Sequence, residues 1–131
     1  MARIAVVVAS VLTLVVASGC RTPMGSAKAT PTPGGQAASI HTLSSRFSPG
    51  ILILEPGGSV RVTVHNSSVV SHTFTVGEPT VDLVVGPGQS EHVTFVPPVR
   101  PTSFICRFHE ADGMKGTLCL RGQECIGQRL S

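Results

Sequence analysis

Residues 60–65 have the sequence VRVTVH, in which every second side chain is a valine and the others are polar. An apolar residue at every second position is typical of a β-strand with one buried face. Similar alternation, or a short apolar run, recurs at intervals suited to short strands: 40–47, 51–54, 72–76, 81–85, 92–95, 103–106 and 117–120. The pattern therefore predicts an all-β sandwich or barrel of seven to eight strands.

The composition of the chain excludes several classes of function. The chain has 131 residues and a mass of 13.6 kDa, which allows one small domain and excludes a multidomain enzyme. A net charge of +3 and the absence of tryptophan and tyrosine argue against a nucleic-acid partner. No paired carboxylates, Ser/His/Asp set or glycine-rich phosphate loop stands out, so we do not expect an enzyme. We expect His41, His65, His92, Asp82 and Glu91 to be solvated surface groups.

The N-terminus predicts export. Arg3 precedes a mainly apolar run over 4–16, and small residues follow it, as in a secretory signal peptide. An uncleaved anchor helix is the alternative. The sequence Ala-Ser-Gly-Cys at 17–20 resembles the lipobox of bacterial lipoproteins, which implies cleavage before Cys20 and lipidation of its thiol. We therefore expect an exported protein, lipid-anchored to the outer face of the cell membrane or in the periplasm.

The sequence divides the chain into three predicted segments. Residues 1–19 are the predicted lipoprotein signal peptide, and 20–39 are a lipidated cysteine with a flexible tether rich in proline, glycine and threonine. The tether has almost no large apolar side chain, so it cannot bury enough surface to offset the entropy of ordering it. The folded domain is expected over 40–131.

Two polar side chains converge on one end of the predicted sandwich. If successive strands reverse direction, the connections 66–71 and 107–114 lie at the same end. The alternation turns His72 and Cys106 toward the core at that end. A buried histidine and cysteine that only pack are the alternative, because free cysteine is often buried.

The residues after Cys106 favour a metal. Cys106, His109 and Met114 form a Cys-x2-His-x4-Met motif in a single connection. With His72 they supply two imidazoles, one thiolate and one thioether. Soft sulfur suits Cu(I) and imidazole suits Cu(II), and two histidines with a cysteine and a distant methionine form the blue-copper ligand set. The spacing thus predicts one copper ion.

Residues 40–120 resemble the cupredoxins, the family that includes plastocyanin and azurin. The resemblance lies in Phe-Ser-Pro at 47–49, Glu-Pro-Gly-Gly-Ser-Val at 55–60, Ser-His-Thr-Phe at 71–74 and the loop 104–118. It implies a Greek-key sandwich with a type 1 copper. By the family pattern, the equatorial ligands would be His72, Cys106 and His109, and the axial ligand would be Met114. Arg-Phe at 107–108 departs from the Ser-Pro or Thr-Pro of some relatives.

The remaining cysteines predict a disulfide. An exported protein with two spare cysteines oxidises them as a rule, so Cys119 and Cys125 are expected to pair. The alternative is a structural zinc site built from Cys106, His109, Cys119 and Cys125. The strand parity of Cys119 opposes it, because that residue faces away from His72.

A mononuclear site of this kind leaves no open position for a substrate, so we expect a one-electron carrier. Copper delivery, storage or sensing is the alternative, and a structural surface domain without copper is a third. Thr73, beside His72, is expected to brace the ligand loop, or else to be an outward strand residue. We expect a monomer whose redox partner docks near His109, on apolar residues of the neighbouring connections: Pro49, Val69, Val70, Pro87 and Phe108.

Overall fold

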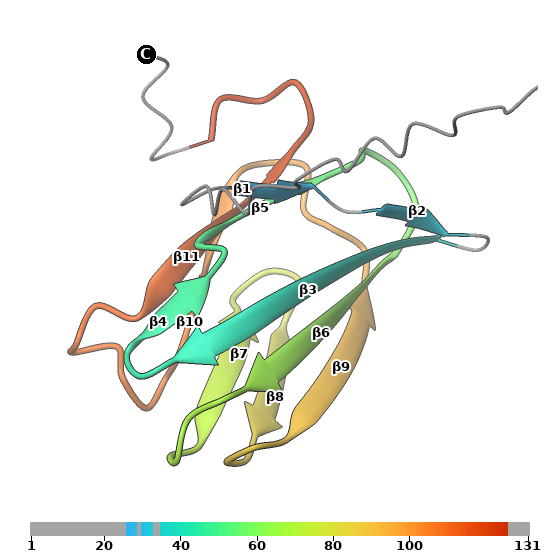
Figure 1. Cartoon of the computed structure of the whole chain (residues 1–131). Helices are drawn as coiled ribbons and strands as arrows, with labels where there is room; N and C mark the ends of the chain where they lie inside the picture. The colour runs from blue at the N-terminus through green and yellow to red at the C-terminus, as the bar shows by residue number, and fades with distance from the viewer. Residues whose placement is uncertain (1–25, 29, 33–34, 126–131) are drawn as a thin grey trace, which may run out of the picture.

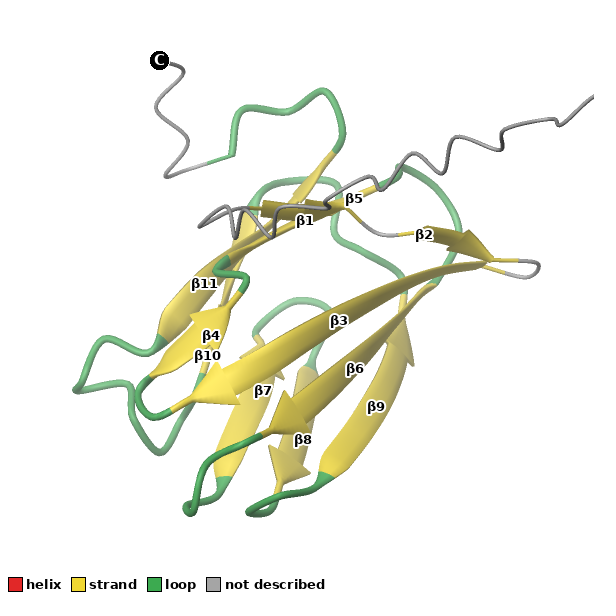
Figure 2. Cartoon of the chain, in the orientation of Figure 1, coloured by secondary structure: helices red, strands yellow, loops and turns green. Residues whose placement is uncertain are grey.

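The computed structural model describes residues 26–28, 30–32 and 35–125, and over these residues the chain contains strands and no helix (Figure 2). The predicted signal peptide and Cys20 lie outside this part. The strands are β1 (Ser26–Lys28), β2 (Thr30–Thr32), β3 (Gly35–Leu43), β4 (Arg46–Ser48), β5 (Ile51–Leu54), β6 (Val60–Asn66), β7 (His72–Val76), β8 (Val81–Val85), β9 (Ser90–Phe95), β10 (Thr102–Ile105) and β11 (Lys115–Leu120).

Two sheets face one another (Figure 1). One has the strand order β1-β5-β11-β10-β7-β8, and the other has the order β2-β3-β6-β9, with β4 paired to β3. Most pairs are antiparallel, but β3 pairs with β6, and β5 pairs with both β1 and β11, in parallel. Parallel neighbours that are distant in sequence require connections across the ends of the sandwich. The predicted all-β sandwich is therefore confirmed.

Side chains from both sheets fill the space between them. Along β6, Val60, Val62 and Val64 are fully buried, as their alternation predicted. Phe104 on β10 lies 5.0 Å from the Phe47 ring and 5.1 Å from the Phe74 ring, measured between centroids. Opposite Phe104 stands Gly116, where any Cβ would meet the phenylalanine ring and the Gly50 carbonyl. This close packing anchors the start of β11, directly after the loop that carries the Cys-x2-His-x4-Met motif.

The folded part begins earlier than the sequence predicted. Strands β1 and β2 and the first five residues of β3 fall within 20–39, the predicted flexible tether. The Gln36 side chain is buried, donates to the Glu55 carbonyl at 2.6 Å and accepts from the Glu55 amide at 2.7 Å. Strand β3 runs parallel to β6 from Gln36 onward. Backbone pairing needs no large side chains, so composition alone misplaced the boundary at 40.

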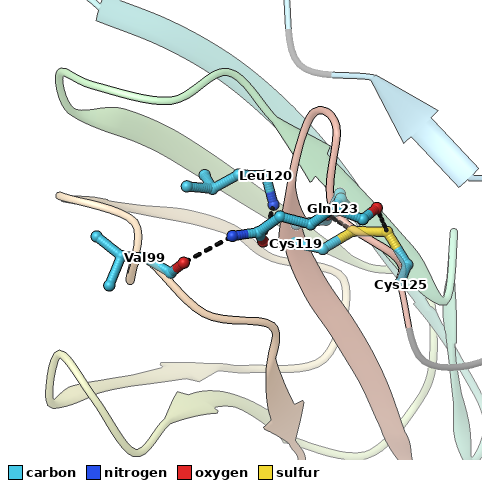
Figure 3. Close-up of a disulfide and its surroundings, with 6 residues drawn as sticks. Val99, Cys119, Leu120, Gln123 and Cys125 are labelled. Carbon is cyan, nitrogen blue, oxygen red and sulfur yellow. Dashed lines mark hydrogen bonds between the residues drawn. A yellow bond between two sulfur atoms is a disulfide. The ribbon is translucent and has the colours of Figure 1, made fainter.

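A disulfide closes the end of the sandwich that follows β11 (Figure 3). Cys119 is bonded to Cys125, the pairing expected from the sequence, and their Cα atoms lie 5.8 Å apart. Within the turn, Gln123 accepts from the Leu120 amide at 3.0 Å and donates to the Val99 carbonyl at 2.6 Å. The C-terminal turn is thereby tied to the β9–β10 connection. Across the described ranges, no helix is long and apolar enough to span a membrane.

Candidate metal centre

Strand pairing brings the predicted ligands together. His72 is the first residue of β7, and Cys106 directly follows β10. Strands β7 and β10 are adjacent and antiparallel, with Ile105 opposite Thr75. The start of one strand therefore lies beside the end of the other. The β6–β7 and β10–β11 connections meet at one end of the molecule, as the sequence analysis expected (Figure 1).

Three donor atoms converge there. The Cys106 Sγ lies 3.7 Å from His72 Nδ1 and 3.4 Å from His109 Nδ1, and all three lie within 4.8 Å of one another. The two imidazole centroids are 4.8 Å apart. His72 and Cys106 are fully buried, whereas His109 is partly exposed. One thiol and two imidazoles around a common point fit a metal that accepts both sulfur and nitrogen. They are the one group of this kind among the described residues.

Thr73 holds the thiol in place. Its backbone amide donates to Cys106 Sγ at 3.3 Å, and its hydroxyl accepts from the Arg107 amide at 2.8 Å. The side chain is fully buried. Both bonds reach residues more than thirty positions away in sequence, on the ligand loop. Thr73 is therefore the brace that the sequence suggested and not an outward strand residue.

A ring of hydrogen bonds extends this brace to the surface. The Thr73 and Thr75 hydroxyls are 3.1 Å apart, and Thr75 donates to Asp82 Oδ1 at 2.7 Å. The Arg107 guanidinium donates to both Asp82 oxygens, at 2.8 and 2.6 Å, which closes the ring. Hydrogen bonds from Arg107 and then Thr75 lower the pKa of Asp82, and Asp82 in turn raises the pKa of Arg107. Asp82 is exposed, as expected, but it also fastens the residue next to Cys106.

Ser68 orients the His72 ring. Its Oγ lies 2.9 Å from His72 Nε2 and 2.8 Å from Asn66 Oδ1. With Nδ1 turned toward Cys106, Nε2 carries the ring proton and donates it to Ser68, which donates to Asn66. Burial, and then the charge of His109, lower the pKa of His72. Both effects favour the neutral imidazole that a metal requires.

Asn66 holds the whole β6–β7 connection. It is 2% exposed, and its Nδ2 donates to three carbonyls, those of Val70, Val85 and Gly86, at 2.7–3.0 Å. Its Oδ1 also accepts from the Thr42 hydroxyl at 3.0 Å. The sequence analysis placed Asn66 and Ser68 in the connection 66–71 and gave neither residue a role. An asparagine at a strand end is the available signal, but its distant partners could not be deduced.

The Met114 backbone is bonded to two of the three converging residues. Met114 is 1% exposed, its carbonyl accepts from the Cys106 amide at 3.0 Å, and its amide donates to the His109 carbonyl at 3.1 Å. These bonds bring the Met114 backbone close to the backbone of both residues. Its role as axial ligand stays a prediction. The alternative zinc site is wrong, because Cys119 and Cys125 are bonded to each other.

No protein-family profile and no curated protein matches the sequence. Several solved structures are similar. The metal-binding domain of a Cu(I)-exporting P-type ATPase from Streptococcus pneumoniae, solved with Cu(I), superposes with a TM-score of 0.65 at 18% identity, over 74% of this chain and 96% of that one. Auracyanin from Roseiflexus castenholzii superposes with a TM-score of 0.55 at 21% identity, over 64% of this chain and 95% of auracyanin. An amicyanin superposes with a TM-score of 0.52 at 18% identity, over 65% of this chain and 82% of the amicyanin.

This chain has the cupredoxin fold. The similar structures establish the architecture, since their low identities carry no residue-level role. Within that cupredoxin architecture, the chemistry rests on side chains of this chain. His72, Cys106 and His109 form a site that could hold a metal ion at one end of the sandwich.

Proposed function

We propose that this protein binds one copper ion through His72, Cys106 and His109, with Met114 as axial ligand, and acts as a one-electron carrier. The observation that carries the proposal is the convergence of both Nδ1 atoms on the Cys106 sulfur. Copper bound by thiolate and imidazole supplies a reversible step between Cu(II) and Cu(I). The ligand types exclude hard cations such as Mg²⁺ and Ca²⁺, which prefer oxygen.

The protein contributes a rigid ligand frame. The Thr73 amide bonds the sulfur, Ser68 bonds the far nitrogen of His72, and the Met114 backbone bonds both neighbours in the loop. Side chains held by such bonds need little rearrangement when the charge of the site changes. His109 is the more exposed imidazole, which makes its ring edge the route for the electron.

Visible and electron paramagnetic resonance spectra of the domain with Cu(II) test this function. We expect an intense thiolate-to-copper absorption band and a small parallel hyperfine splitting, and both should vanish in Cys106→Ala. Cys106→Ala can keep its fold, because it removes a single sulfur atom. A folded wild-type domain that binds no copper in this way would refute the proposal.

Copper handling is the second candidate, and one observation favours it. The superposing ATPase domain is described as metal-binding and was solved with Cu(I). The two functions differ in what leaves the site. A carrier exchanges electrons with a redox partner and keeps its copper, whereas a delivery protein passes Cu(I) to an acceptor. Copper retained through repeated oxidation and reduction, in the presence of a Cu(I) chelator, favours the carrier.

We further propose that a redox partner docks on the apolar surface near His109. Val69 is 91% exposed, and Phe108 and Val70 are about half exposed, on the two connections that bear the site. Small redox partners form weak and brief interfaces of this kind. Val70→Asp should slow electron exchange and leave the spectrum unchanged. Val99→Asp, at the disulfide end, is the matched control and should leave both unchanged.

Membrane attachment is proposed from Cys20, which lies outside the described residues. Detergent partitioning of the wild-type chain should place it in the detergent phase, and Cys20→Ser should abolish lipidation. A mature protein that begins elsewhere than residue 20 and partitions into water would refute the anchor. The copper site would be unaffected by that result.

A further inference from the structure

Three histidines outside the copper site lie on one face of the molecule. On β3, β6 and β9 the side chains alternate, and His41, His65 and His92 occupy the outward positions. Strand pairing sets His41 directly opposite His65, and sets Ser90 opposite His65 on the other side. His92 is opposite Thr63, one outward position further along. The sequence analysis expected solvated surface histidines, and the parallel pairing of β3 with β6 makes two of them neighbours.

The His41 and His65 rings form a close pair. Their centroids are 4.8 Å apart and the ring planes differ by 25°. The His65 Nδ1 lies 2.8 Å from the Ser90 hydroxyl. This contact leaves the Nε2 of His65 outside the Ser90 hydrogen bond. The rings are stacked, and neighbouring strands lie about 5 Å apart, so rotation of the two side chains can turn a nitrogen of each ring toward one ion.

The contact between Ser90 and His65 matches the one at the copper site. There, the Ser68 hydroxyl bonds the Nε2 of His72 and leaves Nδ1 for the metal. At the surface pair, the Ser90 hydroxyl bonds Nδ1 and leaves Nε2. An imidazole that binds a metal through one nitrogen carries its proton on the other, and a serine hydroxyl can accept a hydrogen bond from that N–H group. Each serine is therefore placed to support its histidine as a metal ligand.

We propose that His41 and His65 form a second metal site, which takes a borderline divalent cation such as Zn²⁺ or Cu²⁺. Imidazole nitrogen is a preferred donor for both ions, whereas Mg²⁺ and Ca²⁺ require oxygen. The pair contains no sulfur, so it lacks the soft donor that Cu(I) favours. His41 is exposed and His65 is partly exposed, in contrast to the buried His72 and Cys106. The ion exchanges freely with solvent, and water completes its coordination.

Zinc titration of the full chain tests this site. The copper site is first filled with one equivalent of copper, and equilibrium dialysis then measures Zn²⁺ binding while the visible band reports any copper displacement. We expect one further equivalent of zinc. His41→Gln and His65→Gln should each weaken its binding about a hundredfold, because two linked donors gain that much from binding together. His92→Gln is the matched control on the same face and should bind as wild type.

The site stands independently of the proposed copper function. The double variant Cys106→Ala/His109→Ala removes two of the three metal-binding side chains of the copper site. Zinc binding at the His41–His65 pair should persist in it. Positions 41 and 65 lie outside the core, so we expect the glutamine variants to keep the fold, and thermal unfolding of each variant checks this. No second equivalent in the wild type, wild-type affinity in either pair variant, or an equal loss in His92→Gln would overturn the proposal.

Discussion

The end of the sandwich that bears His72, Cys106 and His109 and the end closed by the disulfide are held by similar bonds with different partners. At the disulfide end the groups satisfy one another: Cys119 bonds Cys125, and Gln36 bonds both the amide and the carbonyl of Glu55. At the other end, bonds converge on side chains that point to a common centre. Each end also has one exposed arginine–carboxylate pair, Arg121 with Glu55 and Arg107 with Asp82.

The comparison separates stability from site geometry. The bonds named at the disulfide end tie chain segments together, and none of them reaches a ligand. At the metal end, Ser68 contacts His72, Thr73 contacts Cys106 and the next residue, and Asn66 accepts from Ser68. Variants at the two ends should therefore differ in the spectrum of bound copper even where they cost similar stability.

The largest effect is expected from Asn66→Ala. It leaves three buried or partly buried carbonyls without their donor and frees the β6–β7 connection. We expect a loss of about 3 kcal/mol in unfolding free energy, and a broadened copper spectrum as His72 loses its support. Chemical denaturation and visible spectroscopy measure the two effects. Gln123→Ala at the other end is the control, and an unchanged spectrum in Asn66→Ala would contradict the comparison.

Removal of the disulfide should cost somewhat less. Cys119→Ala/Cys125→Ala opens a short loop, which lowers the unfolding free energy by about 2 kcal/mol on the chain-entropy account. Thermal and urea unfolding of the double variant provide the measurement. The copper spectrum and reduction potential should stay those of the wild type. A shifted potential would mean that the two ends are coupled.

Met114→Leu should have a smaller effect on stability but a distinct effect on the copper. The volumes are similar, so the cost in unfolding free energy stays below about 1.5 kcal/mol. The colour should persist and the reduction potential should rise, since loss of an electron donor favours Cu(I) over Cu(II). Voltammetry measures the potential. Bleaching as complete as in Cys106→Ala would show that Met114 is not an axial ligand.

The smallest effects are expected from the exposed ion pairs. A hydrogen bond from Arg121 lowers the pKa of Glu55 from its ordinary value of 4.5; desolvation opposes this shift, and the charges of Arg121 and Lys28 add to it. The pair therefore stabilises the fold above that pH, and its contribution is lost as pH falls through the lowered pKa. Glu55→Gln should flatten this part of the acid-unfolding profile. It should leave the copper spectrum unchanged at neutral pH.

Asp82→Asn is the counterpart at the metal end. The pKa of Asp82 is also lowered, from 3.8, so the acid dependence has the same sign. Here the ring through Thr75 and Thr73 leads to the sulfur of Cys106, and a small shift of the thiolate band should accompany the change. Identical copper spectra for Glu55→Gln and Asp82→Asn would show that the ion pair at the metal end is no more strongly coupled to the copper site than the ion pair at the disulfide end.

Local patterns were sufficient for the strands from Ile51 onward and for the ligand residues, but they missed β1, β2 and the turn that divides 40–47 between β3 and β4. Alternation along 60–65 and 72–76 reports which side chains face the core, because side chains on a strand point to opposite faces in turn. Cys106 and His109 could be identified together because only two residues of one loop separate them. Strand direction then placed His72 at the same end. These inferences needed only short-range geometry.

Sequence alone determined the all-β class, the converging donors of His72, Cys106 and His109, and the pairing of the two spare cysteines. Tertiary structure decided the early start of β3, the role of Asn66 and the ring through Asp82. It also decided the pairing of His41 with His65. The physical reason is that these features depend on strand register and on hydrogen bonds between groups 19 to 34 positions apart. A polar side chain in a sequence has many possible partners, and only the packed sheets select one.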